Sequence, residues 1–573
     1  MVFSSLLFVF LFLALNLVSQ AALRGARQKN IAMLLFSLVF FSWAGPRYVV
    51  LLLLDTALCW FFAICIEREP QRKRLHLSLC VALVLLVLGI FKYTGFLMGN
   101  LQSLFGWPEV IPQIVLPIGI SFYTFQLISY VVDVYRGEVR AQKKYWILLL
   151  YASLFHQCIA GPIVRYRDVA QDLAKRQVHA EEVSRGISRF TVGLAKKAVL
   201  ANSVAVLADR WLPMTTEGLA KIPTAGLWLG GLCYMLQIYL DFSAYSDMAI
   251  GMGLMCGFHY KENFNYPYIA SSVTDFWRRW HISLSTFFRD YVYIPLGGNR
   301  RGKGRQLLNL FIVWGLTGLW HGASWNYVLW GLYFFLFLVI EKFLLGEKQQ
   351  RIPAVLRHLF LLIIVYFCWV IFRFRDAAAL GMALRGLFGG GTAAAGMAVG
   401  LSLKNNIFLL LVACVACTPL TAKLWQRWKA AAQGDSAFAG NRLLRGAAAV
   451  WEVIHPVLLL LLAAMAPRRA AASIIQPVFR ASMVVISSSV RDCPSPRRSS
   501  TWPPTIPWGP AAWANVAIPR QMRSGGKGAF ARVAKAAVSS PSPANTALAS
   551  PYTLWLVGWP RRKSSSSIQG KSS

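Results

Sequence analysis

The sequence predicts an all-α, polytopic membrane protein with re-entrant segments and a cytoplasmic interfacial helix. Hydrophobic residues make up 56% of the 573 residues and charged residues only 14%, which is typical of membrane proteins. Apolar runs with few charges recur along the chain, and several are long enough to cross a bilayer. The clearest runs are 2–18, 48–66, 77–90, 228–240 and 359–372.

The first apolar run, 2–18, is expected to be a retained membrane helix. No basic residue precedes it and a basic cluster at 24–29 follows it, which is the reverse of the charge order in a secretory signal. Because basic loops favour the cytoplasm, we expect the N-terminus outside and the basic stretches 24–29, 68–74 and 136–144 inside.

Two apolar regions do not fit simple membrane crossings. The run 145–164 joins two basic stretches that both favour the cytoplasm, so we expect a re-entrant segment around Ala160-Gly161-Pro162. The run 307–340 is interrupted by Trp320-His321-Gly322-Ala323-Ser324. A simple crossing would place these polar residues and a conformationally flexible glycine inside the membrane. This pattern predicts broken helices that line a protein-walled cavity.

Aromatic and basic residues both concentrate in 271–305, between these two regions. Thr274 is a candidate N-cap, and a row of large apolar residues follows at helical spacing. These residues are Phe276, Trp277, Trp280, Leu284 and Phe288. We therefore predict one interfacial helix on the cytoplasmic side.

The composition changes abruptly near residue 467, directly after the apolar run 457–464. Pro, Ser, Arg and Ala then dominate, acidic residues almost vanish, and such a sequence cannot build a core. We predict a membrane domain over 1–465 and a disordered, basic, Pro- and Ser-rich tail over 466–573. Translation in a shifted reading frame is a further hypothesis for this tail, which resequencing the gene would test.

The net charge of +36 does not indicate a nucleic-acid partner, because many of the Lys and Arg residues lie in short loops between apolar runs. Membrane lipid is the partner that such loops favour. The ten cysteines lie mostly within apolar runs, and the closest pair, Cys414 and Cys417, has no neighbouring His. This pattern predicts core packing, with no metal site and no disulfide.

His321 is the main catalytic candidate. It follows the uncharged run 307–320, where an imidazole is costly unless it is hydrogen-bonded or faces a wet cavity. A neutral imidazole suits a general base, which takes a proton from a hydroxyl and returns it to a leaving group. The alternative is a histidine that only bonds to a neighbouring helix.

Three further residues are weaker candidates by sequence alone. His281 lies on the aromatic side of the predicted interfacial helix, where packing is the alternative. Asp241 and Asp247 interrupt the apolar segment 227–254. At helical spacing Asp241 and Tyr245 share one face, while Ser243 and Asp247 share another. Helix-to-helix hydrogen bonding is the alternative for both faces.

The loop 297–305 combines glycines with several cations, including Arg300, Arg301 and Lys303. These side chains are candidates for binding the phosphates of a coenzyme A thioester or of an anionic lipid. The loop matches no nucleotide-binding motif, and a simple cytoplasmic anchor is the alternative.

Three ordered segments, 239–253 (YLDFSAYSDMAIGMG), 276–300 (FWRRWHISLSTFFRDYVYIPLGGNR) and 318–322 (GLWHG), resemble the membrane-bound O-acyltransferase family. The start MVFSS, the segment 116–123 (LPIGISFY) and Ala160-Gly161-Pro162 resemble a bacterial branch of this family that O-acetylates exopolysaccharide. The likeness covers about 1–465, so the membrane domain is expected to be an O-acyltransferase domain. The stretch after Pro456 departs from a family-like final helix.

The resemblance implies that His321 is the active-site histidine and His281 the second characteristic position, around a channel through a ring of transmembrane helices. It implies no bound cofactor and acetyl-CoA as the cytoplasmic acyl donor. The acetyl groups would cross the bacterial inner membrane to periplasmic acetyltransferase proteins that modify an exopolysaccharide such as alginate. A related branch of the family moves D-alanine towards teichoic acids.

Our leading hypothesis is acetyl transfer with His321 as general base or acyl-handling residue, His281 assisting, and Asp241 with Tyr245 supporting the site. A polysaccharide or lipid exporter is the main alternative, because transporters also contain broken helices and intramembrane carboxylates. A non-catalytic protein that recruits periplasmic enzymes is a third possibility, for which His321 would be dispensable.

Overall fold

The computed structural model describes residues 2–43, 45–107, 111, 114–158, 161–390, 396–433 and 442–465. Helices and connecting segments make up these residues, and no strand occurs among them, which confirms the all-α class. The predicted tail 466–573 lies outside the described residues, as does Ala160 of the predicted re-entrant segment.

Twenty α-helices occur in the described part of the chain. The first ten are α1 (Ala14–Ala22), α2 (Ala26–Ser42), α3 (Pro46–Arg68), α4 (Lys73–Phe105), α5 (Ile120–Arg136), α6 (Tyr145–Ser153), α7 (Tyr166–Ala174), α8 (Ala180–Ala195), α9 (Asn202–Trp211) and α10 (Thr216–Leu219). The others are α11 (Thr224–Met255), α12 (Val273–Arg279), α13 (Ile282–Phe288), α14 (Gly302–His321), α15 (Trp325–Val339), α16 (Ala354–Arg373), α17 (Ala377–Arg385), α18 (Gly396–Ala416), α19 (Leu420–Gln433) and α20 (Arg442–Met465).

Short π-helical turns extend several of these helices. Such turns are η1 (Leu7–Leu13) before α1, η2 (Lys196–Ala201) between α8 and α9, η4 (Arg289–Tyr293) after α13, and η5 (Ile340–Leu345) after α15.

Six helices of the described chain are long and apolar enough to cross a membrane. They are α3, α4, the continuous helix Ala180–Trp211 formed by α8, η2 and α9, the helix Trp325–Arg351 that begins as α15, α16 and α18. The protein is therefore a multi-pass membrane protein, as the composition predicts.

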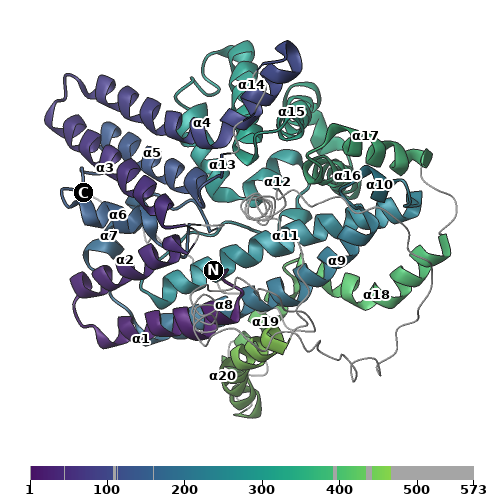
Figure 1. Cartoon of the computed structure of the whole chain (residues 1–573). Coiled ribbons are helices and arrows are strands. Elements are labelled where there is room, and N and C mark those ends of the chain that lie inside the picture. The colour runs from purple at the N-terminus through teal and green to yellow at the C-terminus, as the bar shows by residue number, and fades with distance from the viewer. Residues whose placement is uncertain are drawn as a thin grey trace, which may run out of the picture.

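Figure 1 shows α11 and α12 in the middle of the molecule. Helices α3, α4 and α5 lie on one side of this centre and α14 to α17 on another, while α18, α19 and α20 lie along the lower edge of the view. Helix α12 therefore lies among helices that come from distant parts of the chain.

Glycines allow α8 and α11 to cross at close range in this centre. A Cβ on Gly186 would lie 2.6 Å from the Gly251 carbonyl oxygen, and a Cβ on Gly251 would lie 2.7 Å from the Gly186 carbonyl oxygen. Small residues at such crossings let helix backbones approach, which is how helices commonly associate in membranes.

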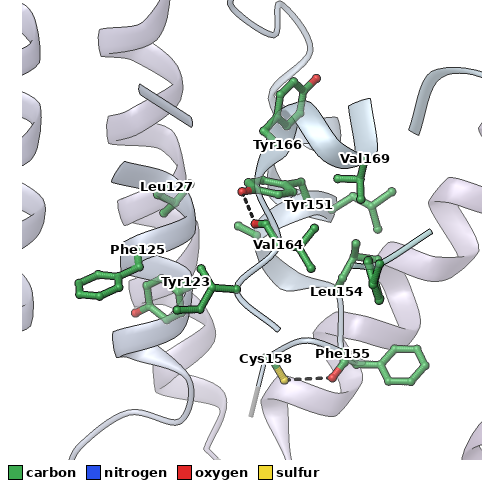
Figure 2. Packing of buried hydrophobic residues seen from close by; sticks show 14 of the residues in the cluster. Tyr123, Phe125, Leu127, Tyr151, Leu154, Phe155, Cys158, Val164, Tyr166 and Val169 are labelled. Carbon is green, nitrogen blue, oxygen red and sulfur yellow. Dashed lines mark hydrogen bonds between the residues drawn. The ribbon is translucent and has the colours of Figure 1, made fainter. Parts of the chain in front are cut away.

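The described segment after α6 does not continue as a helix. Helix α6 ends at Ser153, and the following residues are buried but not helical. In Figure 2 the Tyr151 hydroxyl points at the Val164 carbonyl, to which it donates a hydrogen bond of 2.9 Å. Irregular backbone is tolerated inside a membrane domain where protein groups satisfy it. The re-entrant path itself stays a prediction.

The prediction of one continuous interfacial helix through 276–288 was wrong. The segment forms two short helices, α12 and α13, which are interrupted at Trp280 and His281. The predicted N-cap was also wrong, because the Ser272 hydroxyl, not Thr274, accepts the Asp275 backbone N–H at 3.0 Å. Apolar spacing alone does not reveal the interruption, since the large residues keep a helical period on either side of it.

Candidate active site

Helix α14 ends at His321, as the sequence predicts for the step into Gly322. Gly322 is extended, with φ −175° and ψ 154°, and α15 begins at Trp325 after the turn. The two helices cross closely, since a Cβ on Gly318 would overlap the Tyr327 carbonyl oxygen. The His321 ring packs edge-on against two aromatic rings, with centroids 4.8 Å from Trp330 and 5.2 Å from Phe372.

His281 lies at the interruption between α12 and α13 and is fully buried. Its φ of 42° is a left-handed conformation, which only one other non-glycine residue of the described chain adopts. Such strain in a residue other than glycine persists only where the surrounding contacts enforce it.

Asn263 supplies those contacts and fixes the tautomer of His281. The Ser283 backbone N–H and hydroxyl donate to Asn263 Oδ1 at 3.1 and 2.9 Å, so this atom is the amide oxygen. His281 Nδ1, 3.2 Å from the same oxygen, must therefore donate its proton. The lone pair of the neutral ring is then on Nε2, which is buried and has no hydrogen-bond partner among the described residues.

Trp320 brings the two histidines into one cluster. Its ring centroid lies 5.9 Å from that of His281 and 4.8 Å from that of His321. Phe125 stacks on Trp320 with centroids 5.8 Å apart, so α5 closes the far side of the cluster. The structure thus joins the two predicted histidines in an aromatic environment.

Asp241 and Tyr245 lie on one face of α11, as predicted, and both contact Lys197. The Lys197 ammonium is 2.7 Å from Asp241 Oδ1 and 5.6 Å from the Tyr245 ring centroid. The other predicted face contacts Lys196, whose ammonium bonds to Ser243 at 3.1 Å and to Asp247 at 2.5 Å. These contacts match the alternative of helix-to-helix bonding.

Phe242 connects the Asp241–Lys197 pair to the histidine cluster. Its ring centroid lies 4.8 Å from that of His281, in an edge-on contact. Asp241 therefore adjoins the site through the backbone of α11, while its carboxylate is paired with Lys197.

A cavity of about 280 Å³ lies beside the cluster, between α12, α13 and α14. Apolar side chains from Trp277, Leu284, Phe288, Val313 and Trp314 form much of its lining. Arg289, Asn299 and Lys342 provide polar groups at the end remote from His321. Thr317, another lining residue, precedes His321 by one helical turn, or about 6 Å.

The loop cations predicted to bind a donor stand outside this cavity. Arg300, Arg301 and Lys303 are exposed and do not line it, although the adjacent Asn299 does. Arg289 and Lys342 are the cations that the structure brings to the cavity.

Sequence reasoning missed Lys92 and Tyr93 of α4. The Lys92 ammonium donates to the Trp320 carbonyl and, at 3.0 Å, to the Ser121 hydroxyl. The Tyr93 hydroxyl donates to the Leu319 carbonyl at 2.8 Å. The available signal was a lysine directly after an apolar run of α4, since an ionisable residue in a membrane helix indicates a partner or a functional role.

Comparison with known proteins identifies the family of this chain. A family model for the membrane-bound O-acyltransferase (MBOAT) family matches residues 144–374, which contain both histidines. The chain is 41% identical over 400 residues to the probable alginate O-acetylase AlgI of Pseudomonas aeruginosa, covering 68% of this chain and 76% of that one. It is 42% identical over 381 residues to the protein of the same name from Azotobacter vinelandii, covering 65% and 75%.

A third relative is the peptidoglycan O-acetyltransferase of Helicobacter pylori, with 32% identity over 425 residues, 68% of this chain and 80% of the relative. The all-helical membrane fold and these relatives together identify a polytopic membrane acyltransferase. The chain belongs to the membrane-bound O-acyltransferase family. It is an O-acyltransferase, an enzyme that transfers an acyl group to an oxygen atom.

Proposed function

We propose that this protein moves acetyl groups from cytoplasmic acetyl-CoA across the bacterial inner membrane for O-acetylation of an exopolysaccharide such as alginate. The observation that carries the proposal is the cluster of His281 and His321 on Trp320. The names of the relatives support acetyl as the acyl group, because the alginate O-acetylases match at higher identity and over more of the chain than the 29% identical teichoic acid D-alanyltransferase of Bacillus subtilis.

In the proposed reaction, His321 is the general base. Its ring takes the proton of an acceptor hydroxyl, whose oxygen attacks the carbonyl carbon of the acetyl thioester. The carbon–sulfur bond breaks, and the imidazolium returns the proton to the departing thiolate. The products are an acetyl ester and free coenzyme A, so atoms and charges balance.

His281 assists this step through its Nε2 atom. Asn263 holds the proton on Nδ1, so Nε2 offers a lone pair to the acceptor hydroxyl or to an ordered water. The aromatic walls exclude bulk water, which limits hydrolysis of the thioester. Asp241 and Tyr245 support the site by fixing α11 through Lys197.

The cavity beside the cluster supports a donor on the cytoplasmic side. Its apolar walls suit the pantetheine arm of acetyl-CoA, and Arg289 with Lys342 suits phosphate groups. The next loop contains three further cations, Arg300, Arg301 and Lys303. In this proposal they extend the cationic surface towards the diphosphate of coenzyme A.

The final acceptor and the partner proteins follow from the same proposal. The acetyl group is passed to periplasmic acetyltransferase proteins, which transfer it to polymer hydroxyls outside the inner membrane. Membrane lipid surrounds the spans, and no nucleic acid takes part.

The His321→Ala variant tests this function in cells that make the polymer. We expect loss of the acetyl signals of the polysaccharide in proton NMR, with normal amounts of the variant in the membrane, because the base is removed. His179→Ala is the matched control, since His179 is an exposed histidine at the start of α8. Membrane vesicles supplied with radiolabelled acetyl-CoA should lose label transfer in the same variant.

Undiminished acetylation in His321→Ala would refute the catalytic assignment and favour an assembly role. Unacetylated polymer trapped inside the cell would instead favour an exporter. Label transfer from other acetyl donors, but not from acetyl-CoA, would refute the proposal that acetyl-CoA is the donor.

A further inference from the structure

Lys92 is an ionisable residue within the apolar helix α4, and its hydrogen-bond partners are a backbone carbonyl and a hydroxyl. Among the described residues, no Asp or Glu lies within ion-pair distance of the Lys92 ammonium. Most of the other residues in the first two thirds of α4 are apolar. The ammonium instead faces the Trp320 carbonyl and the Ser121 hydroxyl, and it lies 5.8 Å from the Trp320 ring centroid. This placement indicates a specific role, because a charge in a membrane helix is costly without one.

Its main acceptor belongs to the last turn of α14, where backbone carbonyls lack partners within the helix. The final turn of this helix includes Leu319, Trp320 and His321. Tyr93 donates to the Leu319 carbonyl and Lys92 to the Trp320 carbonyl, so two successive side chains of α4 satisfy two successive carbonyls. A cation at the C-terminal end of a helix also interacts favourably with the helix dipole.

These bonds fix the residue that separates the two histidines. Lys92 contacts Trp320 through both the carbonyl and the ring, and the Trp320 ring packs against His281 and His321. Without Lys92, the end of α14 would be free to shift or to fray. A shift of His321 by one ångström is enough to misalign it for proton transfer.

We propose that Lys92 is a positioning residue for acyl transfer, holding the Trp320–His321 end of α14 together with Tyr93. This inference rests on the proposed role of His321. Helix α4 lies outside the region 144–374 that the family model matches. The inference gives this helix a direct part in building the active site.

The test uses the full-length protein in membrane vesicles with its complete acetylation system and radiolabelled acetyl-CoA. Rates are expressed per folded enzyme, measured from the monodisperse fraction after solubilisation. We expect Lys92→Met to lower kcat by about 10- to 100-fold while KM for acetyl-CoA changes little. Lys92→Arg should recover most of kcat, because a guanidinium still donates to the carbonyl.

Thr94→Val is the matched control on the same helix. The Thr94 hydroxyl bonds only to the Ile90 carbonyl of α4 itself, at 2.7 Å, so its loss should leave kcat unchanged. Tyr93→Phe removes the second bond to α14 and should lower kcat less than Lys92→Met does.

A wild-type kcat per folded enzyme in Lys92→Met, even with a lower melting temperature, would overturn the proposal in favour of a purely structural role. A raised KM with unchanged kcat would overturn it in favour of donor binding. If Lys92→Met does not accumulate, Lys92→Gln and Tyr93→Phe decide, and wild-type kcat in both refutes positioning. Activity in His321→Ala refutes the proposed role of His321, on which this inference rests, whereas inactivity there with a wild-type kcat in Lys92→Met refutes only the positioning role of Lys92.

Discussion

At the scale of single residues, two polar contacts orient groups in and next to the site. Asn263 orients His281 and selects its tautomer, and Lys197 pairs with Asp241. The Asn263 contact decides which nitrogen of His281 carries the lone pair, so we expect a change at Asn263 to alter the proposed reaction without removing a reacting group.

His259 is a titratable residue outside the membrane spans, in the segment after α11. The Asp172 carboxylate raises its pKa to about 9, burial opposes this, and the Glu182 carboxylate adds to it. Its Nε2 atom lies 3.0 Å from Glu182 Oε1, so the imidazolium ties this segment to α7 and α8. About half of the side chain is exposed, which limits the energy gained.

The sign of the pH dependence follows from that raised pKa. An unfolded histidine titrates near pH ~6.5, so the stabilisation is complete below this pH and is lost as pH rises through about 9. We expect the melting temperature of solubilised wild-type protein to fall between pH 6.5 and 9.5, and to fall less in His259→Gln. Equal falls in both proteins would show that the pairing contributes no stability.

At the scale of elements, the α14–α15 hairpin sets the position of His321. Gly318 on α14 faces the Tyr327 carbonyl of α15, and Gly331 on α15 faces the Trp314 carbonyl of α14. The absence of side chains at these crossings lets the hairpin close, and α4 then secures its end through Lys92 and Tyr93.

Gly318 and Gly315 form a matched pair for testing this packing. A Cβ on Gly318 would overlap backbone of α15, whereas a Cβ on Gly315 would meet nothing within 4 Å. We expect Gly318→Ala to destabilise the protein by about 1–3 kcal/mol through overpacking, with reduced acetylation. Gly315→Ala should be neutral or stabilising by up to about 1 kcal/mol, because alanine favours a helix. Thermal melting of the two variants checks both, and equal melting temperatures would contradict the close crossing.

At the scale of the whole molecule, both halves of the chain build the site. The histidines come from the centre of the sequence, while α4 and α5 supply Lys92, Tyr93 and Phe125. The region that forms this assembly lies well before the tail 466–573, for which composition predicts no core.

Ending the chain after Met465 tests the predicted division into a membrane domain and a dispensable tail. We expect the shortened protein to reach the membrane in the same amount as the full-length protein and to give an unchanged degree of polysaccharide acetylation, because all the residues proposed for the site precede this point. The matched comparison is a chain ended after Ala416, which loses α19 and α20. Loss of acetylation on removing only 466–573 would show that the tail contributes to function.

The sequence by itself determined the membrane class, the helix break after His321 and the two faces of α11. These features depend on local patterns: apolar runs, a polar step within such a run, and helical spacing. The resemblance to a known family then singled out His281 and His321, which composition and periodicity left ambiguous.

Only the tertiary structure decided how these residues meet. The interruption at His281 depends on Asn263, and the end of α14 depends on Lys92 and Tyr93, all of which are distant in sequence from the residues they hold. Helical periodicity continues unbroken across 276–288, so no local pattern reports a turn that a distant amide enforces. The capping of a helix by another helix is a through-space contact, and only folding brings those groups together.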